Sequence, residues 1–246
     1  NAPVDFLYAE LWPPSFSNYD QLKQVIDMNR NLVNGEKNTV LAAYMNYGMA
    51  DRKGEFNEPG VLLTDSVIFA SGGAHIELGD TGMLSKEYFP SNNLSMSESL
   101  VEKMEDYYNF LVAYQNLLRD GVTERDTIVT SDQVPLSNYA KSGSIWYFAK
   151  EKAGYEILHL INFSNQSSLA WRDDQGTHSE PETINDFTIK YYTEADITGV
   201  YLASPNFDEG IATSLSFSKG QDDQGKYLKL TIPALQYWDM IYFTKK

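Results

Sequence analysis

The chain of 246 residues carries a net charge of −15 and contains no cysteine. Disulfides and thiolate metal sites are therefore excluded, and no apolar run is long enough to predict insertion into a membrane. Because its lysines and arginines form no cluster, the acidic balance argues against nucleic acid and anionic membrane surfaces as partners, whereas a neutral substrate such as a sugar is compatible with it.

The first half of the chain alternates strand-like and helical patterns. An apolar run at residues 4–11 predicts a strand buried on both faces, which Pro13 and Pro14 end. This alternation implies a parallel sheet with right-handed crossovers. The further elements expected here are helices near 18–33 and 61–73, strands at 39–47 and 74–80, and a helix from the capping-box pattern at 95–98 to Gly121.

The second half, residues 122–246, consists of strand-like runs separated by turn signals and predicts an antiparallel β-sandwich with Greek-key connections. The expected domains are therefore 1–121 and 122–246. The sequence DDQG occurs at 173–176 and again at 222–225, and both copies are expected to be hairpin turns. Two adjacent aspartates lack the spaced oxygen ligands of a calcium loop, so no metal is expected there.

Polar side chains gather where the three expected strands end, which is the edge at which α/β barrels place their active sites. Glu10 is the leading catalytic candidate, because a carboxylate near the end of an apolar strand is costly unless it is paired or has a chemical task. Aromatic rings, an amide, an imidazole and further carboxylates around it would suit a sugar. The expected substrate-binding residues are Trp12, Tyr44, Asn46, Tyr47, His75, Glu77 and Asp80.

Several of these side chains also have a purely structural explanation. Glu10 could pair with an arginine, and His75 could be a core histidine bonded to a backbone carbonyl. Asn46 could cap a loop, Trp12 could serve packing alone, and Asp80 could be a turn residue. Taken from the residues alone, Glu10 and a second carboxylate at position 77 could form the pair that an inverting glycosidase requires.

Four segments, FLYAELWP, NTVLAAYMNY, LLTDSVIFASGGAHIELGD and the stretch 84–120, resemble the later barrel segments of glycoside hydrolase family 66, the dextranases and cycloisomaltooligosaccharide glucanotransferases. The resemblance covers roughly residues 3–120. It implies a (β/α)8 TIM barrel of which this chain holds the last three βα units, a retaining mechanism, and α-1,6-glucan (dextran, isomaltooligosaccharides) as substrate. The glutamate of the AELW segment, Glu10, would be the general acid/base, and Glu77 would bind substrate.

The resemblance also implies that the nucleophilic aspartate lies on an earlier strand, in an upstream half of the same polypeptide. The chain by itself is therefore expected to be an inactive fragment of a bacterial extracellular or cell-surface dextranase that needs no metal or organic cofactor. Two alternatives stay open: a transglycosylase that makes cyclic products, and a non-catalytic glucan-binding protein.

Overall fold

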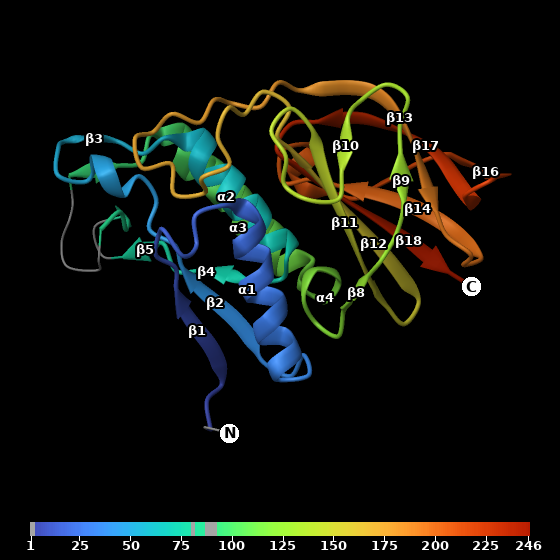
Figure 1. Ribbon diagram of the computed structural model, residues 1–246, viewed down its shortest axis with the longest axis horizontal. Helices are drawn as coiled ribbons and strands as arrows, with labels where there is room; N and C mark the ends of the chain where they lie inside the picture. The colour runs from blue at the N-terminus through green and yellow to red at the C-terminus, as the bar shows by residue number, and fades with distance from the viewer. Residues whose placement is uncertain (1–2, 80–81, 87–92) are drawn as a thin grey trace. The chain divides into compact units, whose positions relative to one another are not determined.

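The computed structural model describes residues 3–79, 82–86 and 93–246 and divides into two compact units (Figure 1). The first unit contains the chain up to Asp120 together with Gln166–Glu180, and the second contains Gly121–Asn165 and Pro181–Lys246. A division near residue 121 was expected, but the return of residues 166–180 to the first unit was not.

The first unit is built on a parallel sheet of strands β1 (Phe6–Glu10), β2 (Asn38–Ala42) and β4 (Ala74–His75), in the order β1-β2-β4. The alternation of strands and helices had predicted this parallel pairing. Neighbouring helices pack beside the sheet (Figure 1): the first contacts β2 and the second helix, which in turn contacts β4 and the third. These helices are α1 (Tyr19–Leu32), α2 (Glu58–Ala70) and α3 (Glu98–Ala113).

Local sequence explains where the helices begin and what they bury. Helix α1 follows the N-cap residue Asn18, whose backbone N–H donates to the side-chain oxygen of Gln21 at 2.9 Å. Helix α3 starts two residues later than the expected pattern, because Ser97 rather than Ser95 is the N-cap, and its hydroxyl accepts a hydrogen bond from the Leu100 N–H. Helix α2 is buried at every position from Gly60 to Ala70, as its apolar sequence requires.

Three elements of the first unit are shorter than expected. Strand β2 ends at Ala42, and the chain then turns through Asn46, which has a left-handed φ of 51°, into the short helix η1 (Tyr47–Met49). Strand β4 ends at His75, so residue 77 lies in a loop. Helix α3 ends at Ala113 and is followed by α4 (Gln115–Leu118). Two short ladders complete this unit, β3 (Gly54–Glu55) with β7 (Leu94–Ser95) and β5 (Leu78–Gly79) with β6 (Gly82–Met83).

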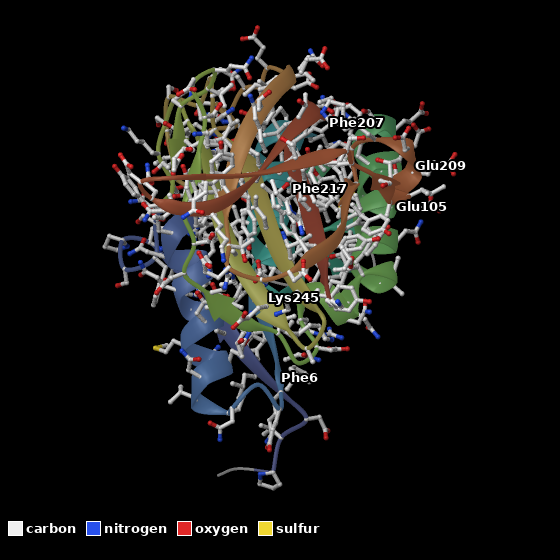
Figure 2. The ribbon with its side chains drawn as sticks, turned by 90° about the vertical axis from the view of Figure 1, so that its right-hand side faces the viewer. Phe6, Glu105, Phe207, Glu209, Phe217 and Lys245 are labelled. Atoms are coloured by element: carbon white, nitrogen blue, oxygen red, sulfur yellow. The ribbon has the colours of Figure 1, made fainter. Side chains whose placement is uncertain are left out.

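Strand β1 is not buried on both faces, which corrects the prediction from its apolar sequence. The side chains of Phe6, labelled in Figure 2, and Tyr8 are 50% and 49% exposed, and Glu10 on the same face is also exposed. Within the described part of the chain β1 pairs only with β2. It is therefore an edge strand with one open face, and its carboxylate lies in a more accessible place than the sequence suggested.

The second unit consists of two sheets that share one hydrophobic core, with buried residues contributed by β11, β12, β14 and β18 on one side and by β9, β13 and β17 on the other. Every strand-like run of the second half forms a strand.

One sheet has the order β10-β11-β12-β18-β14-β15, with β8 paired to β11, and the other has the order β16-β17-β13-β9. Pairing is antiparallel except between β10 and β11. The strands are β8 (Thr123–Arg125), β9 (Val129–Thr130), β10 (Leu136–Ser137), β11 (Ile145–Lys152), β12 (Tyr155–Asn162), β13 (Ile184–Tyr192), β14 (Ile197–Ala203), β15 (Thr213–Ser214), β16 (Phe217–Asp222), β17 (Gly225–Leu235) and β18 (Trp238–Lys245), with a short helix η2 (Asp208–Gly210).

The two DDQG copies have different structures. At 222–225 the sequence closes the hairpin between β16 and β17, where Asp222 faces Gly225. At 173–176 it lies in the coil segment that belongs to the first unit, between strands that end at Asn162 and begin at Ile184, so the expected hairpin there is wrong. The same four residues therefore form a hairpin turn in one place and a loop in the other.

A buried carboxyl group gives the second unit a pH-dependent stability. Burial raises the pKa of Asp239 on β18 to about 8, and the Ser204 hydroxyl offsets only part of that rise. The folded unit thus retains a proton that the unfolded chain loses above pH 4, so this group lowers stability increasingly from about pH 4 to pH 8.

We expect Asp239→Asn to relieve this cost, since asparagine has the same shape and no charge. The free energy of unfolding of the variant should rise relative to the native chain as the pH increases from 4 to 8, by at most roughly 5 kcal/mol at about 1.4 kcal/mol per pKa unit. Urea unfolding at several pH values measures the difference, with Asp223→Asn on the exposed β16–β17 turn as control. A difference that does not vary with pH would contradict the assignment.

Candidate active site

Glu10 ends strand β1 and is held by two donors from its own segment. The Tyr8 hydroxyl donates to its Oε1 at 2.7 Å, and the Trp12 indole N–H donates to its Oε2 at 3.2 Å. Residues 8, 10 and 12 fall on one face because side chains alternate along an extended strand. The carboxylate is exposed, so these two hydrogen bonds fix its orientation while leaving it open to a substrate.

An aromatic wall stands beside this glutamate. It consists of Trp12, Tyr44 and Tyr47, with the Trp12 ring centroid 5.8 Å from each tyrosine ring, tilted by 51° to the first and by 86° to the second. Tyr44 is buried, whereas Trp12 and Tyr47 are half-buried. Half-buried aromatic rings next to an exposed carboxylate offer both an apolar surface and a proton-transfer group to one ligand.

A cation from a distant part of the sequence packs against this wall. The guanidinium carbon of Arg172 lies 5.0 Å from the Trp12 ring centroid and 4.9 Å from that of Tyr47, within the range of cation–π contacts. Arg172 belongs to the segment 166–180, which no local pattern had connected with the first unit.

Buried polar groups anchor that segment. The Asn46 side chain donates to the Asp173 carbonyl oxygen at 2.7 Å, and the Asn57 side chain donates to the Asp173 carboxylate at 2.6 Å. The second carboxylate oxygen of Asp173 accepts hydrogen bonds from the backbone N–H groups of Thr177 and His178. Asn46, which was expected to contact sugar, is fully buried and instead holds this segment in place.

A second buried cluster lies where strand β4 ends, formed by Asp65, His75, Glu77 and Tyr108. The histidine Nδ1 is 2.8 Å from an Asp65 oxygen and 3.2 Å from a Glu77 oxygen, and the Tyr108 hydroxyl donates to Glu77 at 2.8 Å. The histidine Nε2 is 2.8 Å from the carbonyl oxygen of Ala43. Because a carbonyl oxygen can only accept, Nε2 must carry a proton.

The charges of this cluster balance internally. Burial and the charge of Glu77 raise the pKa of Asp65 to about 8, which favours its neutral form. Burial opposes the charging of His75, but Glu77 and the Asp65 hydrogen bond raise its pKa well above the usual value. Burial would likewise raise the pKa of Glu77, yet the charge of His75 outweighs it and lowers that pKa. An imidazolium therefore faces one carboxylate.

Among the described residues, Asp65, His75 and Glu77 form the only group of three potential metal ligands, with ligand atoms within 4.8 Å of one another. The ion pair between the imidazolium and Glu77 occupies the same atoms that a metal would need. All three are buried, so the cluster stabilises the end of β4 from inside. This differs from the expectation that His75 and Glu77 contact sugar directly.

Removal of the Tyr108 hydroxyl should weaken this cluster. In Tyr108→Phe, Glu77 loses a donor while remaining buried, and the free energy of unfolding of the first unit should fall by about 1–3 kcal/mol. Urea denaturation at pH 7 measures the change, with Tyr139→Phe, an exposed tyrosine of the second unit, as control. Equal urea midpoints for the two variants would refute a supporting role for the hydroxyl.

The structure thus brings together part of the site expected from sequence. Glu10, Trp12, Tyr44 and Tyr47 form one group, whereas Asn46, His75 and Glu77 are buried and support the fold from within. Asp80 lies outside the described residues. Sequence reasoning missed Asp65, Tyr108 and Arg172; only the first gave a signal, as a carboxylate in the middle of an apolar helix.

An exposed glutamate beside aromatic rings, at the carboxyl end of a parallel strand, is an arrangement typical of enzymes that act on carbohydrates. The model of glycosyl hydrolase family 66 matches residues 1–242 of this chain. The chain therefore belongs to glycosyl hydrolase family 66, as its sequence segments suggested.

The similar proteins are of two kinds, cycloisomaltooligosaccharide glucanotransferases and a dextranase. Two cycloisomaltooligosaccharide glucanotransferases of Niallia circulans are 39% and 41% identical over 199 residues, which cover 78% of this chain and 20% of each relative. A dextranase of Streptococcus salivarius is 25% identical over 98% of this chain and 35% of the dextranase. The crystal structure of a Paenibacillus sp. cycloisomaltooligosaccharide glucanotransferase complexed with cycloisomaltoheptaose aligns with a TM-score of 0.90 at 26% identity, over 98% of this chain and 52% of that one.

The chain thus spans between a fifth and about a third of the length of these curated relatives. Across the described residues, no helix has the length and apolar character that a bilayer crossing requires.

Proposed function

We propose that this chain is the acid/base-bearing part of a retaining enzyme that cleaves the α-1,6 linkages of dextran. The observation that carries the proposal is Glu10 itself: an exposed carboxylate at the end of β1, oriented by Tyr8 and Trp12 and flanked by half-buried aromatic rings. The carboxyl group of Glu10 donates a proton to the leaving O6 and afterwards removes one from the incoming hydroxyl. The exposed parts of Trp12 and Tyr47 pack against the sugar rings.

The first unit then corresponds to the last three βα units of a (β/α)8 barrel, and the second to the Greek-key sandwich that follows it. The open face of β1 supports this, as does its outer edge, which pairs with no strand of the described residues, because a preceding barrel strand would pair there. The nucleophilic aspartate would come from the upstream part of the same polypeptide, and the 246 residues alone would be inactive. The whole enzyme would act outside the bacterial cell.

The inverting alternative needs a second carboxylate beside Glu10 that can activate a water. The partner it would need, Glu77, is 2% exposed and engaged by His75 and Tyr108. A carboxylate in that position cannot activate a water beside a sugar ring, so the geometry favours one acid/base in this chain and a nucleophile elsewhere.

The second candidate function is transfer of the cleaved glucan to its own chain end, which yields cyclic products. Higher identity to the glucanotransferases, 39% and 41% against 25% for the dextranase, favours it. Both reactions share the step in which Glu10 acts as an acid, and they differ only in whether water or a sugar hydroxyl accepts the glucosyl group.

Incubating the full-length protein with dextran and separating the products by chromatography tests the proposal. Linear isomaltooligosaccharides indicate hydrolysis, and products without reducing ends indicate cyclising transfer. Binding to dextran with no change in its chain length would contradict an enzymatic role and support a glucan-binding protein.

A further inference from the structure

We infer that Arg172 is a positioning residue for the acid/base Glu10 and acts on it through the Trp12 side chain. The inference rests on the proposed function, since it assigns to the segment 166–180 a role in the chemistry of Glu10. It concerns a residue that lies 162 positions along the chain from that glutamate.

The surroundings of Arg172 favour ring stacking over ion pairing. Its side chain is 8% exposed and its Nε finds no hydrogen-bond partner within the described structure. Its ion pair with the largely exposed Asp174 carboxylate is long, 3.9 Å from Nε. By contrast, aromatic rings surround the guanidinium, at 5.0 Å (Trp12), 4.9 Å (Tyr47) and 5.5 Å (Trp171). A planar cation can stack in this way, whereas the point charge of lysine cannot.

The Trp12 ring connects Arg172 to Glu10 through one hydrogen bond. The Trp12 ring that Arg172 packs against donates its indole N–H to Glu10 Oε2. Arg172 Nη2 also lies 3.5 Å from the carbonyl oxygen of Leu11, between the glutamate and the tryptophan in sequence. Because Glu10 is exposed, its orientation depends on such neighbours rather than on burial.

The backbone of Arg172 is itself fixed, which a positioning role requires. Its carbonyl oxygen accepts a hydrogen bond from the Asn46 N–H at 2.9 Å. The next residue, Asp173, is held by the side chains of Asn46 and Asn57. Arg172 therefore projects from a rigid support onto the ring that orients the acid.

The expected signature of this role depends on the leaving group. In full-length Arg172→Met, kcat/KM for dextran should fall by about 10- to 100-fold, the worth of one hydrogen bond to a charged group. For a 4-nitrophenyl glycoside of an isomaltooligosaccharide, kcat/KM should stay within about twofold, because a good leaving group departs without a proton. Loss of folded protein or of sugar binding would reduce both values equally.

Companion variants connect the effect to Trp12. Trp12→Phe keeps an aromatic ring for the sugar but removes the indole N–H, so kcat/KM should fall more for dextran than for the aryl glycoside. The double variant Arg172→Met/Trp12→Phe should be no worse than Trp12→Phe alone, because the two residues act in series. Arg172→Lys should retain an intermediate rate, and Arg119→Met, whose arginine contacts Gln115 and Asp120, should match the native enzyme.

Glu10→Gln, measured beside these variants, distinguishes failure of the proposed function from failure of the Arg172 role alone. If it keeps native activity on dextran, the proposed function is wrong, and the positioning role with it. If it loses dextran activity as expected while Arg172→Met loses both substrates equally, or while the double variant is additive, then only the role of Arg172 is overturned.

Discussion

Replacing Glu10 by glutamine should lower the rate of dextran cleavage by the full-length enzyme about 10²- to 10⁴-fold, the usual contribution of a general acid. Glutamine preserves the shape and can still pair with Trp12 and Tyr8, but it cannot deliver a proton to the leaving O6. The fold should be unaffected, because Glu10 is exposed. Initial rates of reducing-end release from dextran measure the effect.

The matched control is Glu105→Gln, which changes an exposed glutamate of helix α3 labelled in Figure 2 and should retain native rates. An aryl glycoside should recover most of the first-step rate in the Glu10 variant, because its leaving group needs no proton. Near-native turnover of dextran by Glu10→Gln would remove Glu10 from the mechanism.

The second large effect expected is on stability, from Trp171→Ala. The Trp171 side chain is fully buried, its indole N–H donates to the Phe16 carbonyl oxygen at 2.9 Å, and its own carbonyl oxygen accepts from Thr64. Truncation leaves a cavity and removes the donor to the Phe16 carbonyl oxygen. The free energy of unfolding of the first unit should therefore fall by about 3–5 kcal/mol. Urea unfolding followed by circular dichroism measures the loss.

Hydrogen exchange with mass spectrometry locates that loss. Exchange should rise in α1 and in the loop before it, since the backbone N–H of Trp171 donates to the Ser17 carbonyl oxygen. Strands β13 and β17 should keep their protection, and Tyr139→Ala, an exposed position, should change neither region. Faster exchange confined to the second unit would show that residues 166–180 do not support the first.

Local patterns predicted the strands of the second unit well, because each is a run of apolar residues bounded by turn signals, and some of these runs alternate with period two. Strand β17 is an example, with buried Leu228, Leu230 and Ile232 between exposed neighbours. Strand ends were less predictable. The apolar run 39–47 continues past β2, but the left-handed turn at Asn46 depends on bonds to Asp173, which is 127 residues away. No local pattern encodes that partner.

The site shows the same division between local and distant information. Glu10 and Trp12 could be paired from sequence because they share one strand face. Arg172 could not be assigned to them, since the DDQG that follows it reads like the hairpin at 222–225. Burial of Glu77 was equally hidden, because it requires the helices that carry Asp65 and Tyr108. Contacts between distant elements, rather than residue types, decide which polar groups are buried and which stay exposed.

Identifying the residue that carries the glycosyl-enzyme intermediate tests whether Glu10 is the acid/base. The full-length enzyme would be trapped with a fluorinated α-glucosyl fluoride, digested, and its labelled peptide sequenced by mass spectrometry. If Glu10 is the acid/base of a retaining enzyme, the label lies on an aspartate upstream of these 246 residues. A label on Glu10 or Glu77 would show that this chain supplies the nucleophile and would contradict the role assigned to Glu10.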